Sequence, residues 1–173
     1  SFSSYAIIAL PPPAAVATVT VTPDSADVLV QGTVALTATT RDADGMVLAG
    51  RPVTWQSAHP AIASVSAAGL VTGVAVGTAT ITATSEGKQG TARVRVLPVP
   101  VASVTVSPGS GEVPFRGTLA LSAATRDAGG NLLTGRSVTW LSSNPAVATV
   151  STTGVVTGVL PGAVTITATS EGQ

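Results

Sequence analysis

The sequence of 173 residues contains no cysteine and a single histidine, His59. No disulfide can therefore stabilise the fold, which must depend on packing alone, and the redox compartment stays open. Without thiolates and with one imidazole, a transition-metal site would be difficult to build. We accordingly expect no metal and no cofactor.

Charged residues are also few: they make up 9% of the chain, and 8 Lys and Arg balance 8 Asp and Glu. A nucleic acid needs a basic surface to neutralise its phosphates, so the balanced charge argues against nucleic acid as a partner. No apolar run approaches the length of a membrane-spanning helix, so no membrane span is expected. No cationic segment precedes the apolar residues 5–10, and the chain begins at Ser1, which indicates a processed N-terminus or a fragment.

The residues that are present favour β-structure. Hydrophobic residues make up 45% of the chain but aromatic residues only 3%, so Val, Ala, Ile and Leu dominate, with many Thr beside them. Side chains branched at Cβ pack well on a pleated sheet, and 18 Gly and 12 Pro supply turns. The apolar content is ample for a core, which argues against disorder.

The sequence repeats itself. Residues Val16–Lys88 align without a gap onto Val101–Gln173, at an offset of 85 residues. The run Thr80–Gly87 recurs unchanged as Thr165–Gly172. A period of this length, with turn signals inside it, predicts a tandem array of small domains, each with a core of its own.

Within each unit, apolar residues alternate with polar ones, as Ala79, Ile81 and Ala83 do between threonines. This period of two marks half-buried antiparallel strands. Seven short strands per unit predict an all-β chain of two tandem immunoglobulin-like antiparallel β-sandwiches. The strands expected in the first unit cover Ala17–Thr22, Val34–Arg41, Val53–Ser57, Ile62–Ser66, Leu70–Val74, Thr78–Ser85 and Thr91–Val96.

The two tryptophans, Trp55 and Trp140, occupy equivalent positions in the middle of an expected strand. Val53 and Val138 precede them on the same face of that strand. An aromatic side chain flanked in this way is typical of a core anchor packed between two sheets. We therefore expect both rings to be mostly buried and not to stack on a ligand.

Four motifs recur in the same order in both units: Val-Thr-Trp-x-Ser, Pro-Ala-x-Ala-x-Val-Ser, Gly-x-Val-Thr-Gly and Gly-x-x-Thr-Ile-Thr-Ala-Thr. This series resembles the bacterial immunoglobulin-like group 2 domain, and the resemblance covers all but about the first 15 residues. Such domains occur in intimin- and invasin-like adhesins, in other surface proteins and in phage virion proteins. The resemblance implies an extracellular or cell-surface module, but it names no ligand, because a fold does not determine function.

The second repeat stops before its last strand. Gln173 is the counterpart of Lys88, so nothing corresponds to Thr91–Val96. A sandwich without this strand leaves unpaired backbone groups and an open flank of the core. The expected organisation is an N-terminal arm with a proline spacer (residues 1–13), a first domain (14–97) and a second domain with an incomplete last strand (98–173).

The arm itself has the pattern of a spare strand. Ala6-x-Ile8-x-Leu10 has the spacing and size order of Ala92-x-Val94-x-Val96, and the prolines Pro11–Pro13 end it. A strand donated to another subunit gains main-chain hydrogen bonds and fills pockets with alternate side chains. The residues expected to form this donor strand are Phe2, Tyr5, Ala6, Ile7, Ile8 and Leu10.

These features predict an extracellular structural subunit that polymerises head to tail into a surface filament, each copy donating its N-terminal strand to the second domain of a neighbour. The principal partner is then the chain itself. The alternative is a stalk or spacer segment of a longer bacterial surface adhesin or phage virion protein, in which the missing last strand reflects only a boundary that falls before it. A glycan- or receptor-binding module is a third hypothesis, but it would require exposed aromatic residues, of which the chain has few.

No catalytic constellation is evident, and we expect the protein not to be an enzyme. His59 precedes a proline in an expected turn. Asp24, Asp42 and Asp44 could contribute oxygen ligands to a calcium site. The counterparts of Asp24 and Asp44 are glycines, however, so any such site is not repeated.

Overall fold

The structure, a computed structural model, describes residues 14–173, and all regular elements in this range are β-strands. The chain divides into two compact units between Pro98 and Val99, which we call domain 1 (residues 14–98) and domain 2 (residues 99–173). No helix long and apolar enough to cross a membrane occurs among the described residues. The prediction of an all-β chain is confirmed.

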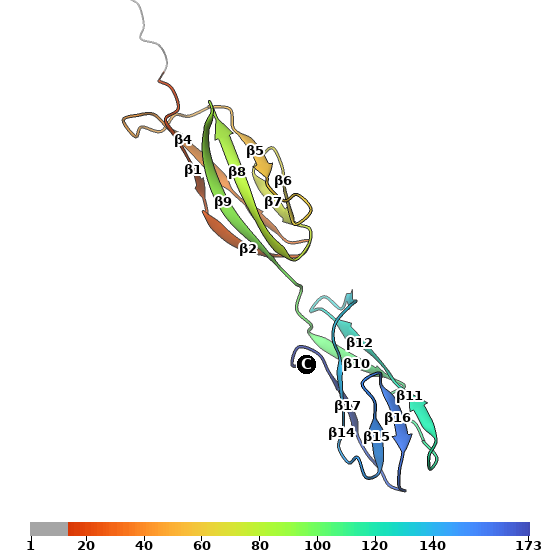
Figure 1. Cartoon of the computed structure of the whole chain (residues 1–173). Helices are drawn as coiled ribbons and strands as arrows, with labels where there is room; N and C mark the ends of the chain where they lie inside the picture. The colour runs from red at the N-terminus through yellow and green to blue at the C-terminus, as the bar shows by residue number, and fades with distance from the viewer. Residues whose placement is uncertain (1–13) are drawn as a thin grey trace, which may run out of the picture. The chain divides into compact units, whose positions relative to one another are not determined.

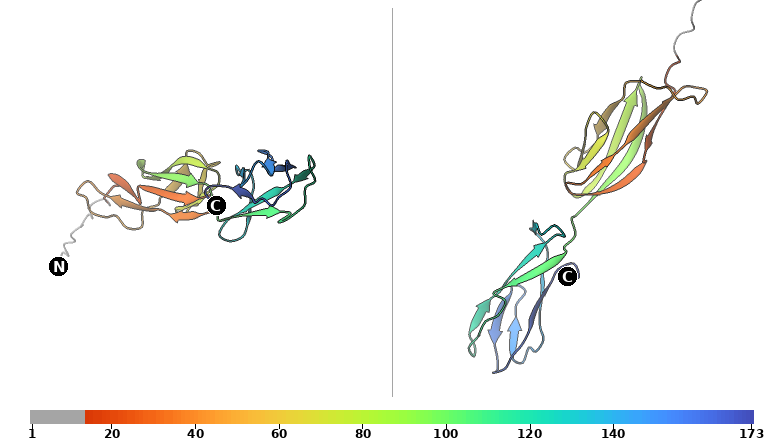
Figure 2. Two further views of the ribbon diagram at one scale, coloured as in Figure 1. Left: turned by 90° about the horizontal axis from the view of Figure 1, so that it is seen from below. Right: turned by 180° about the vertical axis from the view of Figure 1, so that it is seen from behind.

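Domain 1 has two layers (Figures 1 and 2). One layer is the sheet β2-β9-β8-β5, and the other comprises the sheets β1-β4 and β3-β7-β6. The strands are β1 (Thr18–Thr22), β2 (Ser25–Leu29), β3 (Thr33–Ala35), β4 (Thr37–Arg41), β5 (Thr54–Ser57), β6 (Ala63–Val65), β7 (Leu70–Gly73), β8 (Gly77–Ser85) and β9 (Lys88–Leu97).

The core of domain 1 lies between these layers. Val71 comes from one layer and Ile81, Val94 and Val96 from the other, and all four side chains are fully buried. Strand β9 contributes alternate residues because a period of two turns them to one face. Burial of one such side chain stabilises the fold by about 1.5–3 kcal/mol.

Domain 2 repeats this plan in part. The sheets β10-β12-β13 and β11-β16-β15 correspond to one layer, and β14-β17 is what the described residues form of the other. The strands are β10 (Ser103–Ser107), β11 (Thr118–Ala120), β12 (Ser122–Arg126), β13 (Leu132–Leu133), β14 (Thr139–Ser142), β15 (Ala148–Val150), β16 (Val155–Gly158) and β17 (Ile166–Thr169).

Domain 1 departs from the expected strands in two places. The expected strand over Val34–Arg41 is broken at Leu36, whose amide donates to the Gly69 carbonyl, so that β3 pairs with β7 and β4 with β1. The sequence reading missed β2, which runs parallel to β9. The sandwich is therefore not wholly antiparallel. A parallel neighbour comes from a distant part of the chain, so no hairpin signal marks it.

Domain 2 differs from domain 1 in the layer that contains β14 and β17. Residues 110–114, the counterparts of β2, form no strand, and β17 has 4 residues where β8 has 9. In domain 1 both elements flank β9. Within the described part of domain 2 no strand lies between them, so neither has a ladder partner on that side.

Candidate functional site

Domain 2 contains an open groove with a volume of about 680 Å³. Two stretches of its lining, residues 108–113 and 160–166, correspond to the regions of β2 and of the first half of β8. The rest of the lining comes from the facing layer and its turns: Val106, Leu119, Leu121, Val147, Ala148, Val156 and Gly158. We call this site the domain 2 groove.

In domain 1 the equivalent space is filled by β9. This strand pairs antiparallel with β8 along its length and parallel with β2. Its inward residues Ala92, Val94 and Val96 are 2%, 0% and 1% exposed. The same fold thus places one β-strand with three inward aliphatic side chains in this position.

The domain 2 groove leaves apolar side chains less buried than their counterparts. Ile81 is 0% exposed and Leu36 is 3% exposed in domain 1. Their counterparts Ile166 and Leu121 are only partly buried. Covering these side chains with a strand would remove apolar surface from water, which is favourable.

One edge of the groove is β17. Among the described residues this strand pairs only with β14, by the register Thr139↔Thr169 to Ser142↔Ile166. Its other side carries backbone N–H and C=O groups available to a further strand.

The opposite edge of the groove, residues 110–114, has no strand partner in the described part of the chain, but the residues that follow it are hydrogen-bonded to the facing layer. The Arg116 N–H donates to the Gly158 carbonyl at 2.9 Å, and the Gly158 N–H donates to the Gly117 carbonyl at 3.1 Å. Domain 1 has the same pair of bonds around Gly73. A Cβ on Gly158 would lie 2.6 Å from the Pro114 carbonyl oxygen, so this close approach requires glycine. The groove is therefore preformed between two edges.

Charge is nearly absent from the groove, whose only ionisable lining residue is Glu112. Its counterpart in domain 1 is Asp27, which accepts a hydrogen bond of 3.0 Å from Nε of Arg95 on β9. That hydrogen bond, with the positive charge of the guanidinium, lowers the pKa of the Asp27 carboxyl. The groove thus offers an apolar floor, backbone edges and one carboxylate, a combination that suits an extended peptide.

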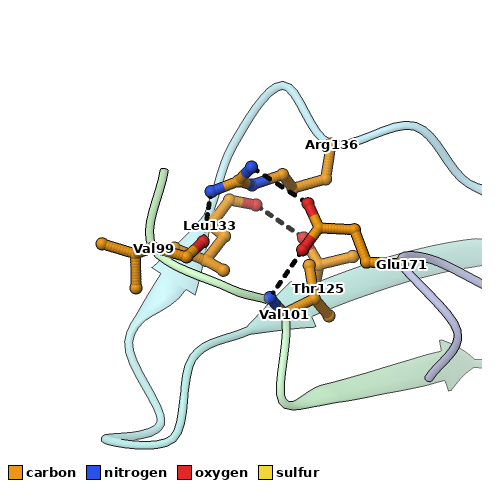
Figure 3. A network of polar contacts seen from close by, with 6 residues as sticks. All are labelled: Val99, Val101, Thr125, Leu133, Arg136 and Glu171. Atoms are coloured by element: carbon orange, nitrogen blue, oxygen red, sulfur yellow. Dashed lines mark hydrogen bonds and ion pairs between the residues drawn. The ribbon is translucent and has the colours of Figure 1, made fainter. Parts of the chain in front are cut away.

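A second arrangement, which we call the linker clamp, lies where the chain enters domain 2 (Figure 3). The Glu171 carboxylate accepts the Val101 N–H at 2.9 Å and pairs with the Arg136 guanidinium at 3.0 Å. Arg136 also donates to the Val99 carbonyl. Two residues distant in sequence, Arg136 and Glu171, thus hold the backbone of Val99–Val101.

Domain 1 has the same clamp. Glu86 accepts the Val16 N–H at 2.9 Å and pairs with Arg51 at 3.0 Å, and Arg51 donates to the Ala14 carbonyl. The same contacts with the backbone that enters the domain therefore occur in both domains. Residue 14 therefore enters domain 1 as the linker enters domain 2.

The repeated sandwich and its sequence identify the family. The sequence matches the bacterial Ig-like domain (group 2) over residues 15–96 and again over residues 100–173. The chain belongs to this family. The resemblance expected from the motifs is confirmed, and both units are bacterial Ig-like domains.

Individual proteins are similar to much of this chain. Ice-binding protein 1 of Shewanella frigidimarina (strain NCIMB 400) is 34% identical over 116 residues, which are 66% of this chain and 13% of that protein. Invasin, a bacterial integrin-binding protein, has 21% identity and a TM-score of 0.50, covering 90% of this chain and 36% of its own. The surface layer protein SbsC, domains 1–6, has 25% identity and a TM-score of 0.45, covering 92% and 27%. The chain thus spans about an eighth of the ice-binding protein that it matches.

The residues expected to form the donor strand, Phe2, Tyr5, Ala6, Ile7, Ile8 and Leu10, lie outside the described residues. Their assignment stays a prediction from the sequence. What the structure describes is the groove to which they were assigned.

The tryptophans of the two Ig-like domains lie on β5 and β14, and each is partly buried. Each ring packs over a glycine with positive φ: a Cβ on Gly69 would lie 2.9 Å from Cζ2 of Trp55, and a Cβ on Gly154 would lie 2.8 Å from Cζ2 of Trp140. Trp55 also packs against the core of domain 1. The rings cover the margin of each core, and smaller aliphatic residues fill its centre.

The polar residues considered for calcium serve turns. The Asp42 carboxylate accepts the N–H groups of Asp44 and Met46 at 3.1 and 2.8 Å. The His59 N–H donates to Oγ of Ser57. Within residues 14–173, no three His, Cys, Asp or Glu side chains lie close enough to hold a metal ion, so Asp24, Asp42 and Asp44 do not form the calcium site considered.

Sequence reasoning missed the linker clamp and Glu112. The signal was present, because Arg51 and Glu86 recur as Arg136 and Glu171 in a chain with few charges. Their partners are backbone groups, however, and no side-chain pattern reveals a backbone partner.

Proposed function

We propose that this chain is a non-enzymatic structural subunit of a bacterial surface, joined to its neighbours by strand donation. The observation that carries the proposal is the domain 2 groove, which occupies the place of β9 and presents two preformed edges. The match to the bacterial Ig-like family and the similarity to invasin, a bacterial integrin-binding protein, support an extracellular location. A strand entering the groove would cover the partly buried Ile166 and Leu121.

The proposed donor is Phe2–Leu10 of a neighbouring copy. Aligning Ala6-x-Ile8-x-Leu10 with Ala92-x-Val94-x-Val96 turns three apolar residues toward the groove. The donor and the groove belong to different domains of each copy, so the contact is heterologous. Such a contact joins copies head to tail and leaves a free donor and a free groove at the ends.

The test compares variants of the whole chain by light scattering coupled to size-exclusion chromatography. Deleting Ser1–Leu10 should leave a monomer. Ile8→Asp should also abolish assembly, because residue 8 faces the groove, whereas Ile7→Asp should preserve it, because residue 7 faces away. Assembly that survives the deletion, or equal effects of the two aspartates, would refute strand donation by the arm.

A second candidate function is a stalk segment of a longer surface protein, in which residues beyond Gln173 would fill the groove within the same chain. The observation that favours it is coverage: the match to the ice-binding protein spans 13% of that protein. On this hypothesis the 173-residue chain is monomeric at all concentrations, with or without its arm. Concentration-dependent growth that requires Ser1–Leu10 would eliminate the stalk hypothesis.

A further inference from the structure

One position of β9 tolerates no side chain. A Cβ on Gly90 would lie 2.5 Å from the carbonyl oxygen of Val19 and 2.9 Å from its carbonyl carbon. Both are backbone atoms of β1, which cannot move aside as a flexible side chain can. Gly90 pairs with Ala83, and the counterparts of Ala83 and Val19 are Ala168 and Val104. A strand in the domain 2 groove therefore meets the Val104 backbone at the residue that pairs with Ala168.

A second position of β9 carries a complementary charge. Arg95 pairs with Asp27 across the parallel ladder, and the two residues are directly opposite in register. The counterpart of Asp27 is Glu112, the only ionisable residue that lines the domain 2 groove. A cation five residues after the glycine would therefore lie opposite Glu112.

Resting on the proposal that the groove accepts a strand, we infer that it selects a strand of the pattern Gly-x-Ala-x-Val-Arg-Val, in which the glycine faces Val104 and the arginine faces Glu112. The strand runs antiparallel to β17 and parallel to residues 110–114, as β9 runs between β8 and β2. The occupant proposed above, the arm of a second copy, matches the apolar positions only. Ser4 aligns with Gly90 and Ala9 with Arg95. The arm is thus a weak occupant that a matched strand displaces.

The first experiment uses a synthetic peptide of residues 88–97 and the chain without Ser1–Leu10. Binding is measured by isothermal titration calorimetry, and the site by hydrogen exchange. The peptide should bind and protect amides of residues 110–113 and 162–166. Gly90→Val in the peptide should weaken binding about tenfold or more, because it forces a side chain against backbone. Thr91→Val places the same valine side chain at the neighbouring outward position and should leave the affinity unchanged.

The charge is tested in the same peptide. Arg95→Glu should weaken binding a few-fold at low salt, and the loss should fade in high salt, since the pair is exposed to solvent. Arg93→Glu changes the net charge equally, but its position is not opposite Glu112. Equal affinities for the Gly90→Val and Thr91→Val peptides, equal losses for the two glutamates, or protection outside the groove would each overturn the selection rule.

The second experiment tests the arm in the whole chain. Ser4→Gly with Ala9→Arg should strengthen assembly, whereas the outward change Ser3→Gly should not. If the whole chain stays monomeric in every form while the peptide still discriminates Gly90, the filament proposal fails and the selection rule stands. If the chain assembles through its arm but the peptides bind without discrimination, the rule fails and the filament proposal stands.

Discussion

Single residues decide how the backbone enters each Ig-like domain. The Val101 N–H is one donor that no strand partner satisfies, and Glu171 accepts it from the other end of the domain. Val101 is itself buried, so its amide would be costly to leave unpaired. Arg136 then orients the carboxylate from the opposite side. The main role of the linker clamp is thus to provide a hydrogen-bond acceptor for the buried Val101 N–H.

This role makes Glu171→Ala the informative substitution. We expect it to lower the free energy of unfolding of domain 2 by about 1–3 kcal/mol, because the Val101 N–H loses its acceptor. Glu171→Gln keeps an acceptor oxygen and should cost less, since the partly exposed ion pair itself contributes about 0–1 kcal/mol. Urea unfolding followed by Trp140 fluorescence in a Trp55→Phe background measures both, with the exposed Glu112→Ala as control. An unchanged stability for Glu171→Ala would contradict the assignment.

A second residue-scale prediction concerns Asp127 in the turn between β12 and β13. Its carboxylate accepts the Asn131 side-chain amide at 3.0 Å, the Asn131 N–H at 2.8 Å and the Gly129 N–H at 2.9 Å. These bonds, led by that from the Asn131 side chain, favour the charged form and lower the pKa of Asp127. The pKa is lower in the folded state than in the unfolded state. The contribution to stability is therefore present above the unfolded pKa and lost as the pH falls through the folded pKa.

Nuclear magnetic resonance titration checks this directly. Asn131→Ala should raise the pKa of Asp127 toward its ordinary value. Asp27 provides an internal control, because its lowered pKa depends chiefly on a hydrogen bond from Arg95 in the other domain and should not move. A pKa of Asp127 that is the same in both forms would show that the side-chain amide does not hold the carboxylate.

At the scale of elements, strand β9 provides hydrogen-bond partners for the strands on both sides of it. In domain 1, β9 lies between β2 and β8, and all three are regular. In domain 2, without a strand in that place among the described residues, the counterpart of β2 is irregular and β17 is short. The run Thr80–Gly87 recurs unchanged as Thr165–Gly172, so the shorter β17 follows from the missing ladder partner. Residues 110–114 differ more from β2, since Gly111 and Pro114 replace Ala26 and Leu29 and themselves disfavour a strand.

Adding the strand should therefore restore its neighbours. We expect a chain extended after Gln173 by a copy of residues 89–97 to form strands over residues 110–113 and 162–170, with slowed amide exchange in both. Domain 2 should gain on the order of a few kcal/mol, the transfer free energy of two buried valines. A copy carrying Val94→Asp and Val96→Asp is the matched control. Protection that appears equally with the control sequence would contradict the prediction.

At the scale of the whole molecule, the two domains differ in how completely their cores are covered. Domain 1 has a continuous cluster of buried side chains that includes Ile81, Val94 and Val96. The buried hydrophobic residues of domain 2 are Val101, Ala148, Val156 and Ala168. Less apolar surface is thus removed from water in domain 2, and its stability should be the lower of the two.

Each domain carries one tryptophan, which allows the two to be followed separately. In urea unfolding, the Trp55→Phe variant reports on domain 2 through Trp140, and the Trp140→Phe variant reports on domain 1 through Trp55. We expect the first variant to unfold at the lower urea concentration. A strand peptide of residues 88–97 should raise only the Trp140 midpoint, because a ligand stabilises the state that binds it. Coincident unfolding midpoints in the two variants, or a peptide effect on both, would contradict the expected difference in stability between the two domains.

The sequence by itself determined the repeat, the fold class and most strands. Alternation at a period of two is local information, and the motifs around Trp55 and Trp140 occur twice in the same order. The position of the groove also followed from the alignment, because Gln173 is the counterpart of the first residue of β9.

Only the tertiary structure decided how distant residues meet. The parallel pairing of β2 with β9, the approach of Gly90 to the Val19 backbone and the hold of Glu171 on Val101 join residues about 70 positions apart. The partly buried tryptophans belong to the same class, since their depth depends on where Gly69 and Gly154 bring the backbone under each ring. Local patterns record which face of a strand is apolar. Backbone-to-backbone distances across a sandwich depend on how the layers pack, and no periodicity of side chains encodes them.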